Sequence, residues 1–290
     1  MFEDFLRSRF NEYPPGNALE QGNMLKEAMQ HYVLASLSKH GLFSEAAFHG
    51  GTCLRIVHGL QRFSEDLDFL LKKPDPAFQW SQYLAGVQRD CHADGLEFEI
   101  VDQNKSEKAV RKTFLKTDSI GSLLYFQLPF GWHRHQKMRI KLEIDIQPPA
   151  GSSFETAYLM FPRPEPLTIQ TLESGFALKI HALLCRSYVK GRDWFDFLWY
   201  VARKVAPDFN LLANALEQQG PWAGTQPDVT IAWLAESLAS RIKQIDWALA
   251  RDDVQRFLPL SEQASLRNWD REMFLYHVEV LLRNFKVLEI

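Results

Sequence analysis

Cysteine is scarce in this sequence, and long apolar runs are missing. The 290 residues include three cysteines, which are far apart and form no CxxC pair, so the sequence offers neither a disulfide framework nor a zinc knuckle. No window approaches the roughly 18 uncharged apolar residues of a membrane-spanning helix. The N-terminal MFEDFLRSRF carries acids where a signal peptide would be basic and then apolar. We therefore expect a cytoplasmic protein that binds no membrane.

An excess of positive charge is also missing. With 33 basic and 36 acidic residues the net charge is −3, which excludes a protein that coats nucleic acid through its overall charge. Residues 104–116 and 129–141 nevertheless concentrate cations, the second stretch with aromatic side chains among them. Either stretch is suited to contact RNA, and the alternative is an ordinary solvated surface. The basic residues expected to reach RNA are Lys112, Lys116, Arg134 and Lys137.

Hydrophobic periodicity divides the chain into two parts. A helical pattern from Asn17 is followed by short apolar runs that are typical of strands, the last of them with strict alternation. This predicts a mixed α/β domain over residues 1–163, with an N-terminal helix and a sheet of four or five strands. Prolines within 161–166 predict a linker. From Leu167 onward the pattern is helical, so residues 164–290 are expected to form an all-helical domain.

Two aspartates mark the first candidate site. Asp66 and Asp68 lie on the predicted strand DLDFLL, so both side chains leave one face while Leu67 and Phe69 point into the core. Adjacent carboxylates repel each other unless a cation lies between them. Mg²⁺ commonly takes one or two carboxylates, with water and substrate phosphates as its other ligands. The pair predicts a Mg²⁺ site, with Mn²⁺ as an alternative ion; the other interpretation is a solvated pair at a strand end.

A second predicted strand supplies further acids. Lys141, Glu143 and Asp145 share one face of KMRIKLEIDI. If this strand pairs beside Asp66 and Asp68, one of its acids completes a three-carboxylate site for two metal ions. Spacing alone does not separate the two candidates; Asp145 is our first choice and Glu143 is the alternative. The competing interpretation is a solvated Lys–Glu–Asp face.

The turn Gly50-Gly51-Thr52 precedes the aspartates by one short predicted helix. Glycine lets a backbone approach a phosphate closely, the amides at the start of the next helix face an anion, and the Thr52 hydroxyl adds a donor. A glycine pair alone usually marks no more than a turn. At this distance before an Asp-Leu-Asp strand, however, it favours nucleotide binding.

The helical part contains a second group of charged residues. Lys179 is expected at the edge of a buried stripe, where its ammonium either reaches a triphosphate or lies along a helix–helix boundary. Asp193 and Asp196 share a helical face beside Arg192. They are therefore also candidates for an N-terminal cap with a local ion pair.

Together these motifs resemble a known superfamily. A glycine pair with threonine, a short helix and an Asp-x-Asp strand are similar to the signature of the DNA polymerase beta-type nucleotidyltransferases. The fuller string GGTCLRIVHGLQRFSEDLDFLL resembles more narrowly the AbiEii/AbiGii toxin family. That family also carries a lysine followed by Arg-Asp-x-x-Asp, matched here at Lys179, Arg192, Asp193 and Asp196. The resemblance covers most of residues 45–200.

The resemblance implies a polymerase beta-type α/β domain followed by a helical domain, and a Mg²⁺-dependent enzyme that uses a nucleoside triphosphate. The catalytic residues that it implies, together with the third-carboxylate choice above, are Asp66, Asp68, Asp145, Lys179, Asp193 and Asp196. The implied nucleotide contacts are Gly50, Gly51, Thr52, Arg62, Ser64 and Lys179.

The resemblance further implies that the nucleotide is moved onto the 3′ end of tRNA, by the toxin of a toxin–antitoxin or phage-defence system with a cognate antitoxin. Two other functions remain open at this point. One is transfer to a protein or to a small-molecule hydroxyl, and the other is a scaffold that has lost catalysis. The intact glycine pair and both aspartates argue against the scaffold.

Overall fold

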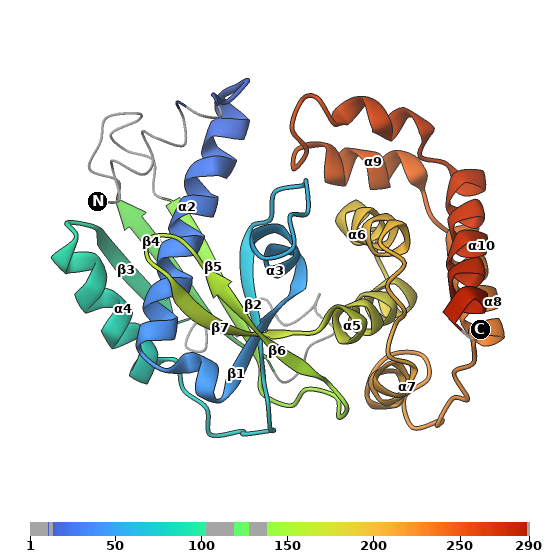
Figure 1. The fold of residues 1–290 in the computed structure, drawn as a ribbon, viewed down its shortest axis with the longest axis horizontal. Helices are drawn as coiled ribbons and strands as arrows, with labels where there is room; N and C mark the ends of the chain where they lie inside the picture. The colour runs from blue at the N-terminus through green and yellow to red at the C-terminus, as the bar shows by residue number, and fades with distance from the viewer. Residues whose placement is uncertain (1–10, 12–13, 103–118, 128–137, 289–290) are drawn as a thin grey trace. The chain divides into compact units, whose positions relative to one another are not determined.

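The computed structural model describes residues 11, 14–102, 119–127 and 138–288. Its chain forms two compact units. The first comprises Met1–Pro148 and Phe154–Ile169, and the second comprises Pro149–Ser153 and Gln170–Ile290. The predicted fold class, a mixed α/β part followed by helices, is confirmed (Figure 1).

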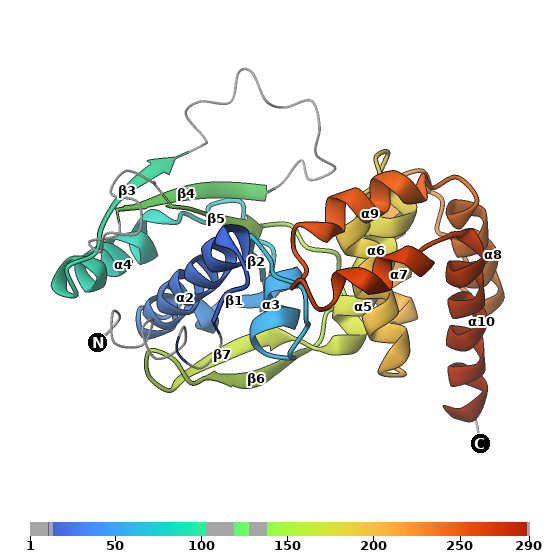
Figure 2. The ribbon, with the colours of Figure 1, turned by 90° about the horizontal axis from the view of Figure 1, so that it is seen from above.

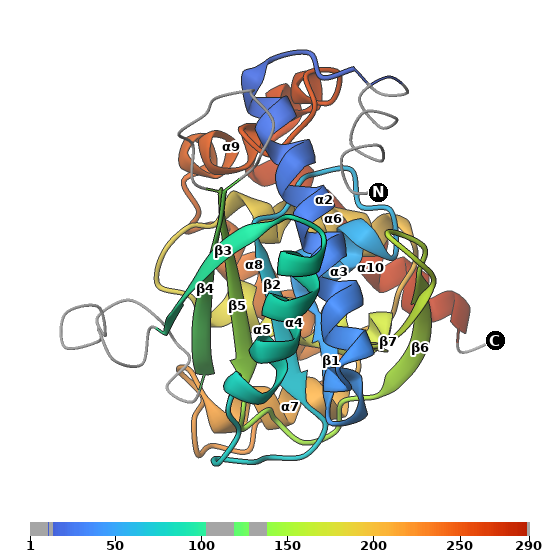
Figure 3. The same ribbon diagram turned by 90° about the vertical axis from the view of Figure 1, so that its left-hand side faces the viewer.

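A seven-stranded sheet forms the centre of the first unit. Its strands are β1 (Ala46–His49), β2 (Asp66–Leu71), β3 (Glu97–Asp102), β4 (Ser119–Gln127), β5 (Met138–Asp145), β6 (Phe154–Leu159) and β7 (Glu165–Gln170). They follow the order β3-β4-β5-β2-β1-β7-β6. β2 is antiparallel to β1 and parallel to β5. The two strands with acidic motifs therefore lie side by side in the interior of the sheet (Figure 3).

The last two strands differ from the sequence prediction. The expectation of four or five strands, and of a helix from Leu167 onward, is wrong here because Leu167 and Ile169 are buried on β7, which runs parallel to β1. Prolines beside and between β6 and β7 obscure the alternation that identifies strands. The helix begins only after Thr171, whose hydroxyl accepts the backbone amide of Ser174. The division between the units accordingly falls at Ile169 rather than at residue 163.

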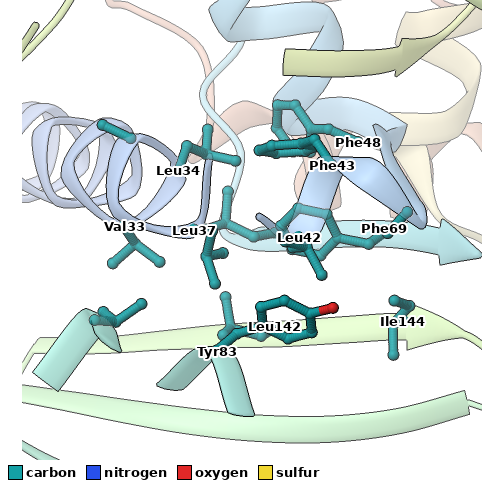
Figure 4. Packing of buried hydrophobic residues seen from close by; sticks show 14 of the residues in the cluster. Val33, Leu34, Leu37, Leu42, Phe43, Phe48, Phe69, Tyr83, Leu142 and Ile144 are labelled. Atoms are coloured by element: carbon teal, nitrogen blue, oxygen red, sulfur yellow. The ribbon is translucent and has the colours of Figure 1, made fainter. Parts of the chain in front are cut away.

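Helices α2 (Ala18–Lys39) and α4 (Ser81–Ala93) cover one face of the sheet (Figure 3). Val33, Leu34 and Leu37 of α2 pack in one core with Phe69 of β2 and Leu142 of β5, and all five are fully buried (Figure 4). Every second side chain of β2 and β5 enters this core. The alternate side chains, which include the acids, therefore leave the opposite face.

Six α-helices within the described residues build the second unit: α5 (Leu172–Cys185), α6 (Gly191–Ala202), α7 (Phe209–Gln218), α8 (Ile231–Ile242), α9 (Trp247–Gln255) and α10 (Arg271–Leu288). Five of them begin at a side-chain cap, since Thr171, Asp208, Thr230, Asp246 and Asp270 accept amides of the first turn. α6 packs against α9, and α8 packs against α10 (Figure 2). In the described part of the chain, no helix is both long and apolar enough to cross a membrane.

Candidate functional site

The acids of the first unit meet where β2 and β5 pair. Asp66 and Asp68 are partly exposed, whereas Leu67 between them is fully buried. The strand register places Asp66 opposite Lys141 and Asp68 opposite Glu143. Residues opposite each other in neighbouring strands have adjacent side chains on the same face. The aspartate pair therefore has one further acid and one base as its immediate neighbours on β5.

The register favours Glu143 over Asp145 as the third carboxylate. Asp145 lies two pairs further along, opposite Leu70, and its carboxylate accepts the backbone amide of Gln147 at 3.1 Å. Among the described residues, no group of three or more His, Cys, Asp and Glu side chains is arranged to hold a metal ion. The two aspartates thus supply a donor pair on one face, with Glu143 beside Asp68 on the neighbouring strand.

Lys141 stands among these acids. Its ammonium forms an ion pair of 2.7 Å with Glu143. Burial alone would lower the pKa of Lys141, but the carboxylates of Glu143, Asp66 and Asp68 outweigh burial and raise that pKa above its usual value. Lys141 is therefore a firmly protonated cation on the acidic face.

The glycine turn at the start of helix α3 (Gly50–Ile56) is required by close approaches. Gly50 has φ of +77°, and a Cβ atom there would lie 2.7 Å from Oδ2 of Asp68. A Cβ atom on Gly51 would collide with the guanidinium of Arg62. Glycine is therefore needed at both positions, so that the Asp68 carboxylate and the Arg62 guanidinium can lie against the turn.

Two of the residues predicted to contact the nucleotide make hydrogen bonds within the protein. Thr52 is fully buried and its hydroxyl donates to the carbonyl of Asp66. Arg62 is 2% exposed and donates to the carbonyl of Phe63 at 3.0 Å. Both side chains therefore fix the segment that leads into β2. Ser64, the third predicted contact of this kind, is partly exposed in that same segment.

Sequence reasoning missed Gln30, which also fixes this segment. Its buried side-chain amide donates to the carbonyl of Ser64 at 3.2 Å and to that of Glu65 at 3.0 Å. A single glutamine within a largely apolar helix carries no motif. Only the packing of α2 against the rest of the first unit identifies its role.

Five charged residues of the second unit form a partly buried cluster, which we call the α5–α6 cluster: Lys179, Arg186, Lys190, Asp193 and Asp196. The ammonium of Lys179 lies 2.8 Å from a carboxylate oxygen of Asp193 and 2.8 Å from one of Asp196. Arg186 pairs with the other oxygen of Asp193 at 2.6 Å. Both aspartates are almost completely buried. The structure therefore brings together the lysine and the two aspartates singled out in the sequence.

The capping interpretation of the two aspartates is wrong. The N-cap residue of α6 is Lys190, and Asp193 faces Lys179 and Arg186 instead. Burial would raise the pKa of Asp193, but Lys179, Arg186 and Lys190 together hold it well below its usual range. A carboxylate that is ionised and buried in this way is stabilised only while its cations remain.

Lys190 of the α5–α6 cluster and the neighbouring Arg192 have different surroundings. Burial, together with Arg186, Arg192 and Lys179, lowers the pKa of Lys190 to about 8, although Asp193 opposes the change. Arg192, which belongs to the sequence motif, turns to α9: it lies 3.6 Å from a carboxylate oxygen of Asp253 and stacks over Phe257. Lys190 and Arg186 carry no sequence motif and were missed for that reason.

The basic residues proposed to contact RNA are Lys112, Lys116, Arg134 and Lys137. All four lie outside the described residues. Their expected role stays a prediction.

Comparisons with known proteins agree with this arrangement. The family model of the nucleotidyl transferase AbiEii toxin of a type IV toxin–antitoxin system matches residues 32–275. The structure resembles JHP933 from Helicobacter pylori, with a TM-score of 0.52 and 18% identity over 92% of this chain and 93% of that chain. It also resembles a provisionally named nucleotidyltransferase from H. pylori, with a TM-score of 0.51 and 18% identity over 92% and 96% of the two chains.

At this level of identity the structural likeness shows a shared fold. No curated protein matches the sequence. The family match, in contrast, spans most of the chain and includes both the Asp66–Asp68 strand and the α5–α6 cluster. The chain therefore belongs to the AbiEii toxin family and is a nucleotidyltransferase.

Proposed function

We propose that the protein transfers a nucleotide from a nucleoside triphosphate to the 3′ end of tRNA in a Mg²⁺-dependent reaction, as a toxin that a cognate antitoxin counteracts. The observation that carries the proposal is the pairing of Asp66 and Asp68 on one face of β2, beside the glycine turn and next to Glu143. Two carboxylates on one face are a donor set that Mg²⁺ commonly takes. Membership of the AbiEii family supports a nucleotide as the transferred group.

The residues of the first unit would hold the metal ion and admit the phosphates. Asp66 and Asp68 are the principal ligands, with Glu143 as the third carboxylate and Asp145 as its alternative. Mn²⁺ suits the same oxygen ligands. A bound ion would withdraw negative charge from the reacting phosphate. Gly50 has no side chain, and this lets the Asp68 carboxylate lie against the turn that would face the phosphates.

The α5–α6 cluster would bind the triphosphate. Lys179, Arg186 and Lys190 carry three positive charges against the two negative charges of Asp193 and Asp196, so the cluster has an excess of one positive charge. Ammonium and guanidinium groups bind phosphate through strong charge-assisted hydrogen bonds. The aspartates orient Lys179, since its ammonium lies between them.

The test is a transfer assay with each labelled nucleoside triphosphate, Mg²⁺ and purified tRNA. Asp66→Asn and Asp68→Asn should each lower transfer by about 100-fold or more, because each removes a charge that holds the ion. Asp252→Asn is the matched control, since this aspartate is exposed on α9. Transfer near the wild-type level in either of the first two variants, with both folded, would contradict the proposal.

The same assay decides between acceptors. Label on protein, or on a small hydroxylated molecule such as an aminoglycoside, would replace tRNA as the acceptor while keeping the transferase. Nucleotide binding without label on any of the three acceptors would favour a scaffold that has lost catalysis.

A further inference from the structure

The loop that joins α5 to α6 carries an exposed aromatic side chain. Tyr188 is 39% exposed, whereas Phe176 of α5 and Trp194 of α6 are almost completely buried. The guanidinium of Arg186 lies over the Tyr188 ring, 5.7 Å from the ring centroid. A guanidinium within about 6 Å of a ring centroid is attracted to the ring. The two side chains therefore support each other while the ring stays accessible.

This loop is fixed at its start. Arg241 of α8 donates to the backbone carbonyl of Leu183 at 3.1 Å and to that of Arg186 at 2.5 Å. The side chain of Arg186 donates in turn to a carboxylate oxygen of Asp193 at 2.6 Å. The Tyr188 ring thus lies against a guanidinium that is itself held in place. A ring that is positioned in advance loses little conformational freedom when a ligand stacks on it.

Arg186 links the ring to the α5–α6 cluster. Its guanidinium contacts both the Asp193 carboxylate and the Tyr188 ring, and Asp193 also pairs with Lys179. A nucleoside triphosphate has a flat base at one end and a chain of phosphates at the other. Aromatic rings stack with bases, and ammonium and guanidinium groups bind phosphate. The two ends of such a ligand therefore match the ring and the cluster.

We propose that Tyr188 stacks with the base of the nucleoside triphosphate whose phosphates are bound by the α5–α6 cluster. The inference rests on the proposed function and adds to it the residue that holds the nucleoside. Stacking needs only the flat face of a base. Tyr188 therefore contributes to the affinity for all four nucleotides.

Tyr276 of α10 provides a matched control. It is 52% exposed, and the guanidinium of Arg283 lies over its ring at the same distance of 5.7 Å. Arg283 pairs with the exposed Glu279 at 3.2 Å, whereas Arg186 pairs with a buried carboxylate. Tyr276 therefore has the exposure and the cation of Tyr188 without the neighbouring cluster.

Equilibrium binding of two ligands tests the inference without turnover. One is a non-hydrolysable nucleoside triphosphate analogue, used with each of the four bases, and the other is inorganic triphosphate, which has no base. Tyr188→Ala should weaken binding of the analogues by about 5- to 100-fold and leave the affinity for inorganic triphosphate unchanged. Tyr188→Phe keeps the ring and should bind both ligands as the wild-type chain does, and so should Tyr276→Ala.

Three results would overturn the inference. The first is unchanged affinity for the analogues in a folded Tyr188→Ala. The second is an equal loss of affinity for both ligands, which would show that the ring only supports Arg186. The third is a loss confined to binding of tRNA, which would assign the ring to the acceptor instead of the nucleotide.

The wild-type chain and one further variant separate this inference from the proposed function. Inorganic triphosphate should displace the analogues from the wild-type chain, and Lys179→Met should weaken binding of both ligands by at least about tenfold, because it removes a cation of the cluster. If the wild-type chain binds neither ligand, the proposed triphosphate site fails and the role of Tyr188 fails with it. If displacement is found but Tyr188→Ala binds as the wild type does, only the inference about Tyr188 fails.

Discussion

The ammonium of Lys190 is destabilised by its surroundings. Burial and three neighbouring cations lower its pKa to about 8, from the ordinary value of 10.5 that it has in the unfolded chain. Between these two pH values the unfolded chain binds more protons than the folded chain, so the contribution of Lys190 to stability becomes more favourable as the pH rises. Below pH 8 the amine is protonated in both the folded and the unfolded chain. The buried charge then lowers the free energy of unfolding by its full amount.

Lys190→Met should therefore raise the free energy of unfolding at pH 7 by about 1–3 kcal/mol. The gain should fade as the pH approaches 10.5, because the amine is then neutral in the wild-type chain as well. Urea denaturation at pH 7 and pH 10 measures both values. Lys243→Met, at an exposed lysine after α8, is the control. A less stable Lys190→Met at pH 7 would contradict this account of the cluster.

A cation that costs stability is expected where a negatively charged ligand binds. This is the physical link between Lys190 and the proposed triphosphate site. Neither Lys190 nor Arg186 was predicted from the sequence, because neither belongs to a motif: Lys190 is the N-cap residue of α6 and Arg186 follows the end of α5. Lys179, Asp193 and Asp196 were predictable from their spacing and from the family resemblance.

At the scale of elements, the segment between α3 and β2 is held from two sides. Gln30 of α2 donates to the carbonyls of Ser64 and Glu65, and Thr52 of α3 donates to the carbonyl of Asp66. These bonds hold three consecutive carbonyls at the point where β2 begins. The position of Asp66, the first proposed metal ligand, therefore depends on side chains of α2 and α3.

Gln30→Leu keeps the size of the side chain and removes both donors. Leaving two partly buried carbonyls without this partner should lower the free energy of unfolding by about 1–3 kcal/mol, and transfer should fall because the start of β2 is less well fixed. Thermal denaturation and the transfer assay measure the two effects. Gln88→Leu, at an exposed position of α4, is the control. Wild-type stability in Gln30→Leu would show that the two bonds contribute nothing.

The elements that carry the acids were predictable because β5 alternates strictly between apolar and polar residues and β2 begins with Asp-Leu-Asp before an apolar run. The choice between Glu143 and Asp145 was not, since it depends on the register of β5 against β2, and both acids fit the alternation equally well. Thr52 illustrates the opposite case. Its motif suggested a nucleotide contact, but its burial and its bond to Asp66 give it a structural role.

At the scale of the whole molecule, charge is distributed unevenly along the sequence. The chain has a net charge of −3, yet residues 104–116 and 129–141 are rich in lysine and arginine. Binding of tRNA by an acidic protein requires local cations, because phosphate contacts supply much of the affinity for nucleic acid. These two stretches are the candidates that the sequence offers.

Arg134→Gln combined with Lys137→Gln should weaken binding of tRNA and leave binding of the nucleoside triphosphate unchanged. Each phosphate contact that is lost should reduce the slope of log affinity against log salt by about 1, because fewer counterions are released. Binding titrations at several salt concentrations measure the slope. Arg271→Gln with Arg283→Gln, two exposed cations on α10, is the matched control of equal charge. Equal slopes for the first double variant and the wild type would remove residues 129–141 from the RNA path, and a protein or small-molecule acceptor would then fit the acidic chain better than tRNA.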